Sequence, residues 1–255
     1  MSEPLHPGLP GSVAAAPTSS ARPASAGDRR QEVVKALMRL AAEQPWADIE
    51  LGDIAAEAGV TLSELRDLFP SKGAILDGLS RMVDKEVIEG TTGDLAGEPA
   101  RERIFDVLMR RLDAMAPYKR ALRRISWALR SDPLSLVALN RSALNSMRYM
   151  LAAADVPTEG PLGTLKVQGT VLAFANIMET WFEDEDPAQA KTMARLDREL
   201  TRGERVLERA DDVRRLTAPL RALGQAVLDG GRRARRRASP EDPASAEAQD
   251  PAAAI

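Results

Sequence analysis

The segment from Leu51 to Leu76 constrains this chain more than any other, because it reads as two short helices joined by a tight turn. The first helix is expected to end at Gly59, since glycine accepts the left-handed backbone that follows many helices. Thr61 and Glu64 then form a T-x-x-E capping box, in which each side chain bonds the other residue's free backbone amide. Pro70 ends the second helix. The pattern predicts a helix-turn-helix, an arrangement that aims one helix at a DNA major groove.

The charge of this segment opposes the function that its geometry suggests. Between Pro45 and Lys72 the sequence carries six acidic residues and only two basic ones, Arg66 and Lys72. Each uncompensated carboxylate near a DNA phosphate costs on the order of 1 kcal/mol at surface dielectric, and less in salt. The cost is real without being decisive, because a carboxylate that caps a helix or points elsewhere does not repel a duplex. The competing interpretation is a helical hairpin that serves only packing.

Composition predicts an all-α fold and narrows the chemistry. Hydrophobic residues make up 44% of the chain and aromatic residues only 4%, so aliphatic side chains and methionine must fill the core. Apolar residues recur at helical spacing between prolines, and runs typical of strands are absent. The chain has no cysteine, and its one histidine, His6, lies in an Ala- and Pro-rich stretch. We therefore expect no enzyme, no metal site and no cofactor.

Four regions are expected along the chain. Residues 1–27 and 231–255 have the composition of disordered tails, residues 28–90 form a helix-turn-helix DNA-binding domain, and residues 98–230 form a helical ligand-binding and dimerisation domain. No stretch resembles a secretory signal or a membrane span, so we expect a cytoplasmic protein. The RRARRR run at 232–237 has two interpretations. It could bind nucleic acid or anionic lipid, or it could be part of a disordered tail that only aids solubility.

Apolar periodicity and the positions of proline and glycine give the expected helices. Asp132-Pro133 and Asp186-Pro187 each read as an N-cap followed by a proline in the first helical position. The expected helices are 28–44, 51–58, a short one after Thr61, 72–89, one closed by Pro117, 118–130, 132–154, 164–183, 187–209 and an amphipathic segment at 211–229.

Residues 29–83 resemble the N-terminal domain of TetR-family transcriptional regulators. The residues that carry the resemblance are Ile54-Ala55, Ala58-Gly59-Val60, Leu65, Phe69, Ser71-Lys72 and Ile75-Leu76. The resemblance implies an all-α TetR-like fold, with a three-helix head, a fourth helix that links to a helical body, and two late helices that pair in a dimer. It also implies a transcriptional regulator that binds double-stranded DNA as a homodimer and responds to an apolar small ligand.

A second resemblance concerns the body. Scattered residues are similar to lipid-binding accessory proteins of ubiquinone biosynthesis, which have a TetR-like fold and no DNA binding; these residues are Ala116-Pro117-Tyr118, Trp181, Asp186-Pro187, Thr192 and 196–200. This alternative implies a pocket for a lipid or isoprenoid and a terminal amphipathic helix for membrane contact. Residues 211–229 would take the place of that helix, and membrane contact is expected only under this alternative.

Candidate site residues follow from these patterns. The side chains expected to meet base edges or phosphates are Thr61, Leu62, Ser63, Arg66, Asp67, Ser71 and Lys72. The side chains expected to line an apolar ligand pocket are Met109, Trp127, Met147, Met150, Phe174, Met178 and Trp181, although the competing interpretation of each is core packing. The helices 164–183 and 187–209 are the expected dimer seam, because the first is apolar over a wide arc.

Overall fold

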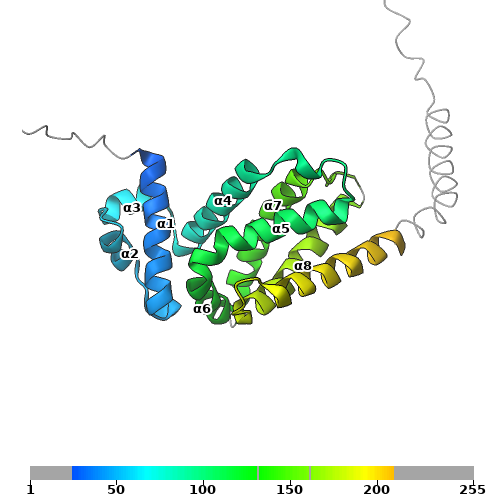
Figure 1. The fold of residues 1–255 in the computed structure, drawn as a ribbon. Coiled ribbons are helices and arrows are strands. Elements are labelled where there is room, and N and C mark those ends of the chain that lie inside the picture. The colour runs from blue at the N-terminus through cyan, green and yellow to red at the C-terminus, as the bar shows by residue number, and fades with distance from the viewer. Residues whose placement is uncertain (1–24, 131, 161, 210–255) are drawn as a thin grey trace, which may run out of the picture. The chain divides into compact units, whose positions relative to one another are not determined.

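The computed structural model describes residues 25–130, 132–160 and 162–209, and all regular secondary structure in these ranges is helical (Figure 1). The expected all-α fold is confirmed. Across the same ranges no helix is both long and apolar enough to cross a bilayer. Three predicted segments fall outside the described residues: nearly all of the N-terminal tail, the amphipathic segment 211–229 and the C-terminal tail with its RRARRR run.

The chain divides into two compact units. Unit 1 holds the described residues up to Val83 together with Pro117–Leu139, and unit 2 holds Asp84–Ala116 together with the described residues from Asn140 onward. The predicted boundary at residues 90–98 does not anticipate that Pro117–Leu139 joins the N-terminal helices. The division into a DNA-binding domain and a ligand-binding domain stays a prediction.

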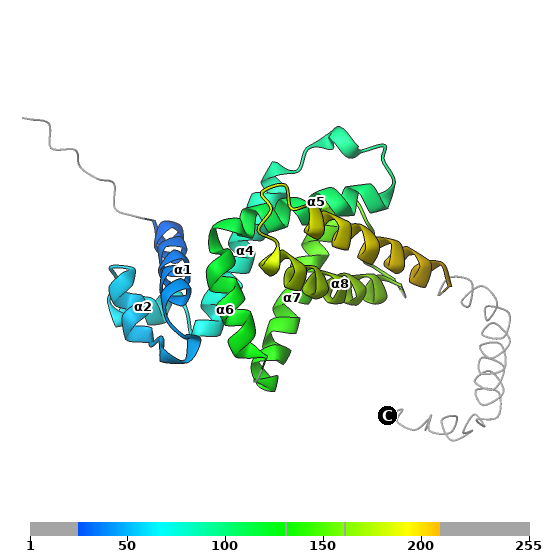
Figure 2. The ribbon, with the colours of Figure 1, turned by 60° about the horizontal axis from the view of Figure 1, so that its bottom comes forward.

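Unit 1 is organised around α1 (Ala26–Glu43), which begins at a capping box between Ser25 and Asp28. Its buried stripe contacts α2 (Leu51–Glu57), α3 (Leu62–Leu68) and α6 (Lys119–Leu129). In both ribbon views α2 lies on one side of α1 and α6 on the other (Figures 1 and 2). The buried stripe consists of Val33, Val34, Ala36, Leu37, Met38 and Ala41.

The first half of α4 (Lys72–Gly90) completes the core of unit 1, where Ile75, Leu79 and Val83 are buried. Gly78 allows a close approach here. A β-carbon at this position would lie 3.0 Å from both the Phe69 ring and a Val34 methyl group. A larger residue at position 78 would push α4 away from Val34 on α1 and from Phe69, which follows α3.

Unit 2 is built from the end of α4, α5 (Ala100–Met115), most of α7 (Pro133–Ala153), α8 (Gly163–Glu183) and a helix over residues 190–209. The helix 190–209 runs beside α8 (Figure 2). Short 3-10 turns occur at Trp46–Asp48, Gly93–Leu95 and Ala116–Tyr118. The largest fully buried side chains of unit 2 are Leu108, Leu112, Met147, Met150, Leu151, Ile177 and Trp181.

The start of the last described helix differs from the expected cap at Asp186-Pro187. Residues 187–188 form a turn, Gln189 has a positive φ of 51°, and the helix begins at residue 190. The carboxylate of Asp184 organises this turn, because it accepts hydrogen bonds from the backbone N–H of Thr192 at 2.9 Å and from its hydroxyl at 2.7 Å. These bonds lower the pKa of Asp184, the hydroxyl bond contributing most.

A buried polar cluster joins three helices in unit 2. Asp84, on α4, forms an ion pair with Arg111 of α5 and accepts a hydrogen bond from the Ser146 hydroxyl of α7 at 2.7 Å. The guanidinium of Arg111 also lies over the Phe174 ring of α8, 5.5 Å from its centroid. Burial lowers the pKa of Arg111, while Asp84 acts in the opposite direction. The buried Asp84 carboxylate therefore links α4 to both α5 and α7.

Candidate functional site

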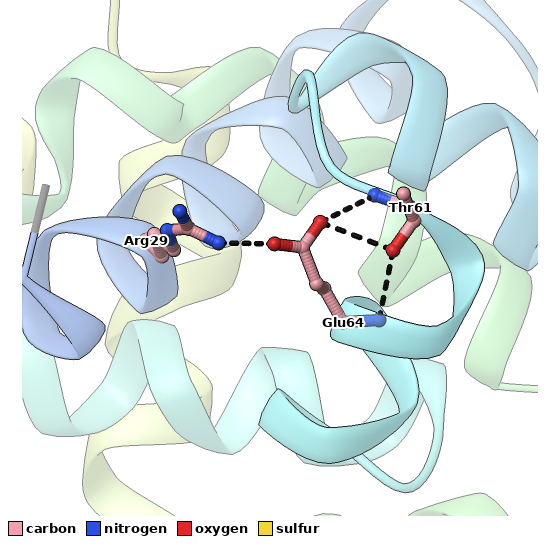
Figure 3. A network of polar contacts seen from close by, with 3 residues as sticks. All are labelled: Arg29, Thr61 and Glu64. Atoms are coloured by element: carbon pink, nitrogen blue, oxygen red, sulfur yellow. Dashed lines mark hydrogen bonds and ion pairs between the residues drawn. The ribbon is translucent and has the colours of Figure 1, made fainter. Parts of the chain in front are cut away.

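The helix-turn-helix forms as the sequence predicts. Gly59 has a φ of 65°, which turns the chain after α2, and Thr61 caps α3. The Thr61 hydroxyl accepts a hydrogen bond from the backbone N–H of Glu64 at 3.2 Å, and the Glu64 carboxylate accepts one from the backbone N–H of Thr61 at 2.9 Å (Figure 3). The bond to this N–H is the main reason that the pKa of Glu64 is lowered. A helix of this length depends on such caps, because it is too short to be stable alone.

Two arginines of α1 form polar contacts with the two ends of α3. Arg29 forms an ion pair with Glu64, which extends the capping network to α1 (Figure 3). Arg30 donates a hydrogen bond to the carbonyl oxygen of Leu68 at 2.7 Å and lies 5.3 Å from the Phe69 ring centroid. Leu65 and Phe69 are buried beneath. The orientation of α3 is therefore fixed by its apolar face and by contacts at both termini.

The opposite face of α3 is exposed and carries four of the predicted DNA-binding residues. Leu62 is 58% exposed, and Ser63, Arg66 and Asp67 are also exposed. The structure thus brings a hydroxyl, a guanidinium, a carboxylate and an aliphatic side chain together on one helical face. Thr61 stands at the start of this face, but its hydroxyl is used in the cap.

The two predicted residues at the start of α4 have contacts within unit 1. The Ser71 hydroxyl accepts a hydrogen bond from the backbone N–H of Ala74 at 3.2 Å. The Lys72 ammonium donates hydrogen bonds to the carbonyl oxygens of Trp46 at 2.8 Å and Ile49 at 2.7 Å, and lies 4.5 Å from the Trp46 ring centroid. Burial lowers the pKa of Lys72. The Lys72 side chain therefore holds the turn before α2, a role that the sequence did not indicate.

Three of the six acidic residues in this segment have partners within unit 1. Glu64 pairs with Arg29, as described above. Glu57 forms an ion pair with Arg39 of α1 at 2.5 Å, and Arg39 also contacts Glu32 at 3.0 Å. The Asp53 carboxylate accepts a hydrogen bond from the backbone N–H of Glu50 at 2.9 Å, where it caps α2. The partners on α1 lie too far away in sequence to be recognised from spacing.

The residues predicted to line a ligand pocket do not gather around one cavity. Trp127 belongs to unit 1 and is 73% exposed, whereas the other six belong to unit 2. Met147, Met150 and Trp181 are core residues, and Met109, Phe174 and Met178 are half-buried. Core packing, the competing interpretation, therefore accounts for Met147, Met150 and Trp181.

Unit 2 does contain a hollow of about 460 Å³, between α5, α8, the end of α7 and the helix 190–209. None of the seven predicted pocket residues lines it. Buried Leu108 and Leu151 contribute to its lining, and Leu172 on α8 and Val206 are 60% and 46% exposed. Its other large aliphatic lining residues are Ile104, Val156, Leu165, Leu200 and Leu207.

Four of the five charged side chains that line this hollow have partners, and the fifth, Glu204, is exposed. Arg101 forms an ion pair with Asp197, and the Lys166 ammonium donates a hydrogen bond to the carbonyl oxygen of Pro157 at 3.2 Å. Glu199 pairs with Arg202 at 2.9 Å and with a further arginine, Arg195, at 3.0 Å. An apolar wall whose charges are mostly paired suits an uncharged ligand better than an ionic one.

Two solved structures share this arrangement of helices. A TetR transcriptional regulator from Nitrosomonas europaea is 23% identical, and the match covers 69% of this chain and 97% of that one with a TM-score of 0.56. A TetR transcriptional regulator from Rhodococcus sp. RHA1 is 15% identical, with coverages of 69% and 94% and a TM-score of 0.51. No protein-family model and no curated protein matches the chain.

The chain has a TetR-like fold. The expectation drawn from residues 29–83 is therefore confirmed for the architecture, and the match extends well beyond those residues into the body. Within this TetR-like chain, α2 and α3 form the helix-turn-helix, and α8 with the helix 190–209 are the late helices that were expected at a dimer seam.

Proposed function

We propose that this TetR-like protein is a transcriptional regulator that inserts α3 into a DNA major groove. The observation that carries the proposal is the rigid support of α3 together with the exposure of Ser63 and Arg66 on its outer face. Arginine reads guanine through two parallel hydrogen bonds, and serine bonds either a base edge or a phosphate. We assign base reading to Arg66, and backbone contacts to Ser63, Ser71 and the amides at the start of α4.

The charge balance supports this assignment. The ion pairs Arg29–Glu64 and Arg39–Glu57 each offset a carboxylate that would otherwise repel phosphates. Asp67 remains exposed on α3, and a carboxylate there accepts a hydrogen bond from a cytosine amino group more readily than it tolerates a phosphate. The acidic head therefore weakens non-specific binding more than it weakens binding at a matching sequence.

A helix-turn-helix protein of this kind reads double-stranded DNA as a dimer, with one recognition helix for each half-site. We propose a homodimer formed by α8 and the helix 190–209, because Leu165, Leu172 and Val206, which also line the hollow, expose apolar surface on these helices. A two-fold dimer would present its two α3 helices to successive major grooves, about 34–36 Å apart.

We further propose that the hollow in unit 2 binds an uncharged apolar ligand that shifts the equilibrium between dimer conformations. Its aliphatic lining and mostly paired charges support this ligand class. A ligand that favours one conformation changes operator affinity by its difference in affinity for the two states.

Fluorescence anisotropy with the duplex upstream of the protein's own gene tests the DNA-binding proposal. Wild type should bind this duplex more tightly than a shuffled duplex, and the affinity should fall as salt rises. Arg66→Ala should lose about 1–3 kcal/mol on the upstream duplex and should discriminate less between the two. Lys35→Ala, which removes an exposed charge from α1, is the matched control and should keep the discrimination. Equal affinity of wild type for both duplexes at low salt would reject the proposal.

The hollow also supports a second candidate, a lipid-binding accessory protein without DNA binding. Native mass spectrometry of the purified chain separates the two functions. A co-purifying neutral isoprenoid lipid, combined with equal affinity for upstream and shuffled duplexes, would favour the accessory protein over the regulator.

A further inference from the structure

The helix α6 lies on the side of α1 away from α2 (Figure 2), and several of its side chains are exposed. The helix α6 buries Ala121, Ile125 and Leu129 against its own unit. Its sequence carries one lysine, three arginines and no acidic residue between Lys119 and Leu129. Because the apolar stripe faces inward, Arg123 and Arg124 stand on the exposed face.

Large apolar side chains are exposed on α6 and on the first turns of α7. Trp127 is 73% exposed on α6, and Val137 and Leu136, near the start of α7, are 71% and 45% exposed. A shallow hollow of about 340 Å³ lies beside Trp127, where Trp46, Arg123 and Arg124 line it together with Pro45 and Ala128. We call the exposed residues Arg123, Arg124 and Trp127 on α6, together with Leu136 and Val137 at the start of α7, the α6–α7 face. No acidic side chain lines its hollow.

We propose that the α6–α7 face binds peripherally to an anionic phospholipid bilayer. Arginines attract the negatively charged headgroups, and tryptophan has its lowest free energy at the boundary between headgroups and acyl chains. Leu136 and Val137 add aliphatic surface that can enter the outer acyl region. This inference is independent of the DNA-binding proposal, because it uses neither α3 nor the hollow of unit 2.

The combination of side chains favours a bilayer over nucleic acid. A duplex backbone would pair with Arg123 and Arg124 but would leave the aliphatic side chains of Leu136 and Val137 in water. Single-stranded bases stack on tryptophan, yet they too have little use for exposed aliphatic residues. A bilayer accommodates both kinds of side chain, because its headgroups attract arginines and its acyl region takes up apolar residues.

Quenching of tryptophan emission by brominated lipid tests the proposal on the full chain. Vesicles of phosphatidylcholine and phosphatidylglycerol in equal parts, with brominated acyl chains, should quench and blue-shift the emission. The effect should be absent with phosphatidylcholine alone and should disappear in high salt. The basic run at 232–237 contains no tryptophan, so quenching does not report on that segment.

Two variants locate the contact. Trp127→Phe should lose most of the quenching while still sedimenting with the vesicles. Arg123→Ala combined with Arg124→Ala should weaken the quenching contact on the order of tenfold or more, since each arginine contributes roughly 1 kcal/mol near such a surface. Lys35→Ala combined with Arg81→Ala removes the same charge from exposed positions elsewhere in unit 1 and should leave the quenching unchanged.

Several results would overturn the proposal. One is sedimentation without quenching, which would place the contact elsewhere in the chain. Another is equal quenching in Trp127→Phe and wild type. A third is loss of duplex affinity, rather than of vesicle quenching, in the Arg123/Arg124 variant, which would make the face a nucleic-acid surface. All the substituted residues are exposed, so the variants should keep the helical circular dichroism of wild type.

Discussion

At the scale of single residues, the account depends on side chains that hold short helices in place. Thr61 and Glu64 satisfy each other's amides at the start of α3, and Arg30 satisfies a carbonyl at its end. Lys72 does the same for the turn before α2, where two backbone carbonyls share its ammonium. The sequence predicted the first of these contacts, because a capping box is local. It could not predict the arginine and lysine contacts, because they join residues far apart in the chain.

Removing the cap of α3 should destabilise the protein and weaken DNA binding together. Thr61→Val deletes the hydroxyl that accepts the Glu64 amide, and we expect it to lower the free energy of unfolding by about 0.5–2 kcal/mol. Ser63→Ala is the stability control, because Ser63 is exposed and lies two residues after Thr61. Urea denaturation measures the stability of both variants. Equal midpoints for Thr61→Val and Ser63→Ala would show that the cap contributes nothing.

Asp184 should make stability depend on pH in the acidic range. Hydrogen bonds from Thr192 hold its pKa below the usual value of 3.8, so the folded state binds a proton less readily than the unfolded state. The stabilisation is therefore present at neutral pH and is lost as the pH falls through the carboxyl range. Asp184→Asn should flatten this part of the thermal-unfolding profile, whereas the exposed Glu185→Gln should not. Identical acid profiles for Asp184→Asn and wild type would contradict this role.

At the scale of elements, the bounds of the helices were predictable and their partners were not. The turn at Gly59 and the cap at Thr61 fixed α2 and α3 to within a residue or so of the structure. The expected helix 118–130 matches α6 closely, but the sequence did not show that its apolar face packs on α1. Methionine and tryptophan at helical spacing did not reveal the hollow in unit 2, because the same spacing serves a core, as it does at Met147 and Trp181.

The buried pair of Asp84 and Arg111 should behave as a joint between α4 and α5. Arg111→Met leaves the Asp84 carboxylate buried without its partner, and we expect it to cost about 3–5 kcal/mol of unfolding free energy. Adding Asp84→Leu removes the stranded charge and should recover most of that loss. Chemical denaturation of the two variants and wild type gives the comparison. A double variant no more stable than Arg111→Met would show that the charge is not the cause.

At the scale of the whole molecule, the proposed function requires two copies, because one α3 helix covers only one half-site. The exposed apolar residues of α8 and of the helix 190–209 are the surface that we assign to pairing. Leu172→Glu with Val206→Glu should therefore convert the dimer to a monomer in sedimentation velocity. Ile88→Glu, which alters an exposed apolar residue on α4, is the control and should remain dimeric. A wild type that sediments as a monomer at all concentrations would remove the basis for two-site binding.

The central claim, that α3 enters a DNA groove, can be measured directly because the chain has no cysteine. Ser63→Cys places a single thiol on the exposed face of α3, and an iron chelate attached to that thiol cleaves the DNA strands nearest to it. The account predicts two clusters of cleavage in the upstream duplex, separated by about one helical turn. The same chelate on Glu98→Cys, an exposed position in unit 2, should not give that pattern. No cleavage by the Ser63→Cys protein, or a pattern identical to that of Glu98→Cys, would contradict the claim.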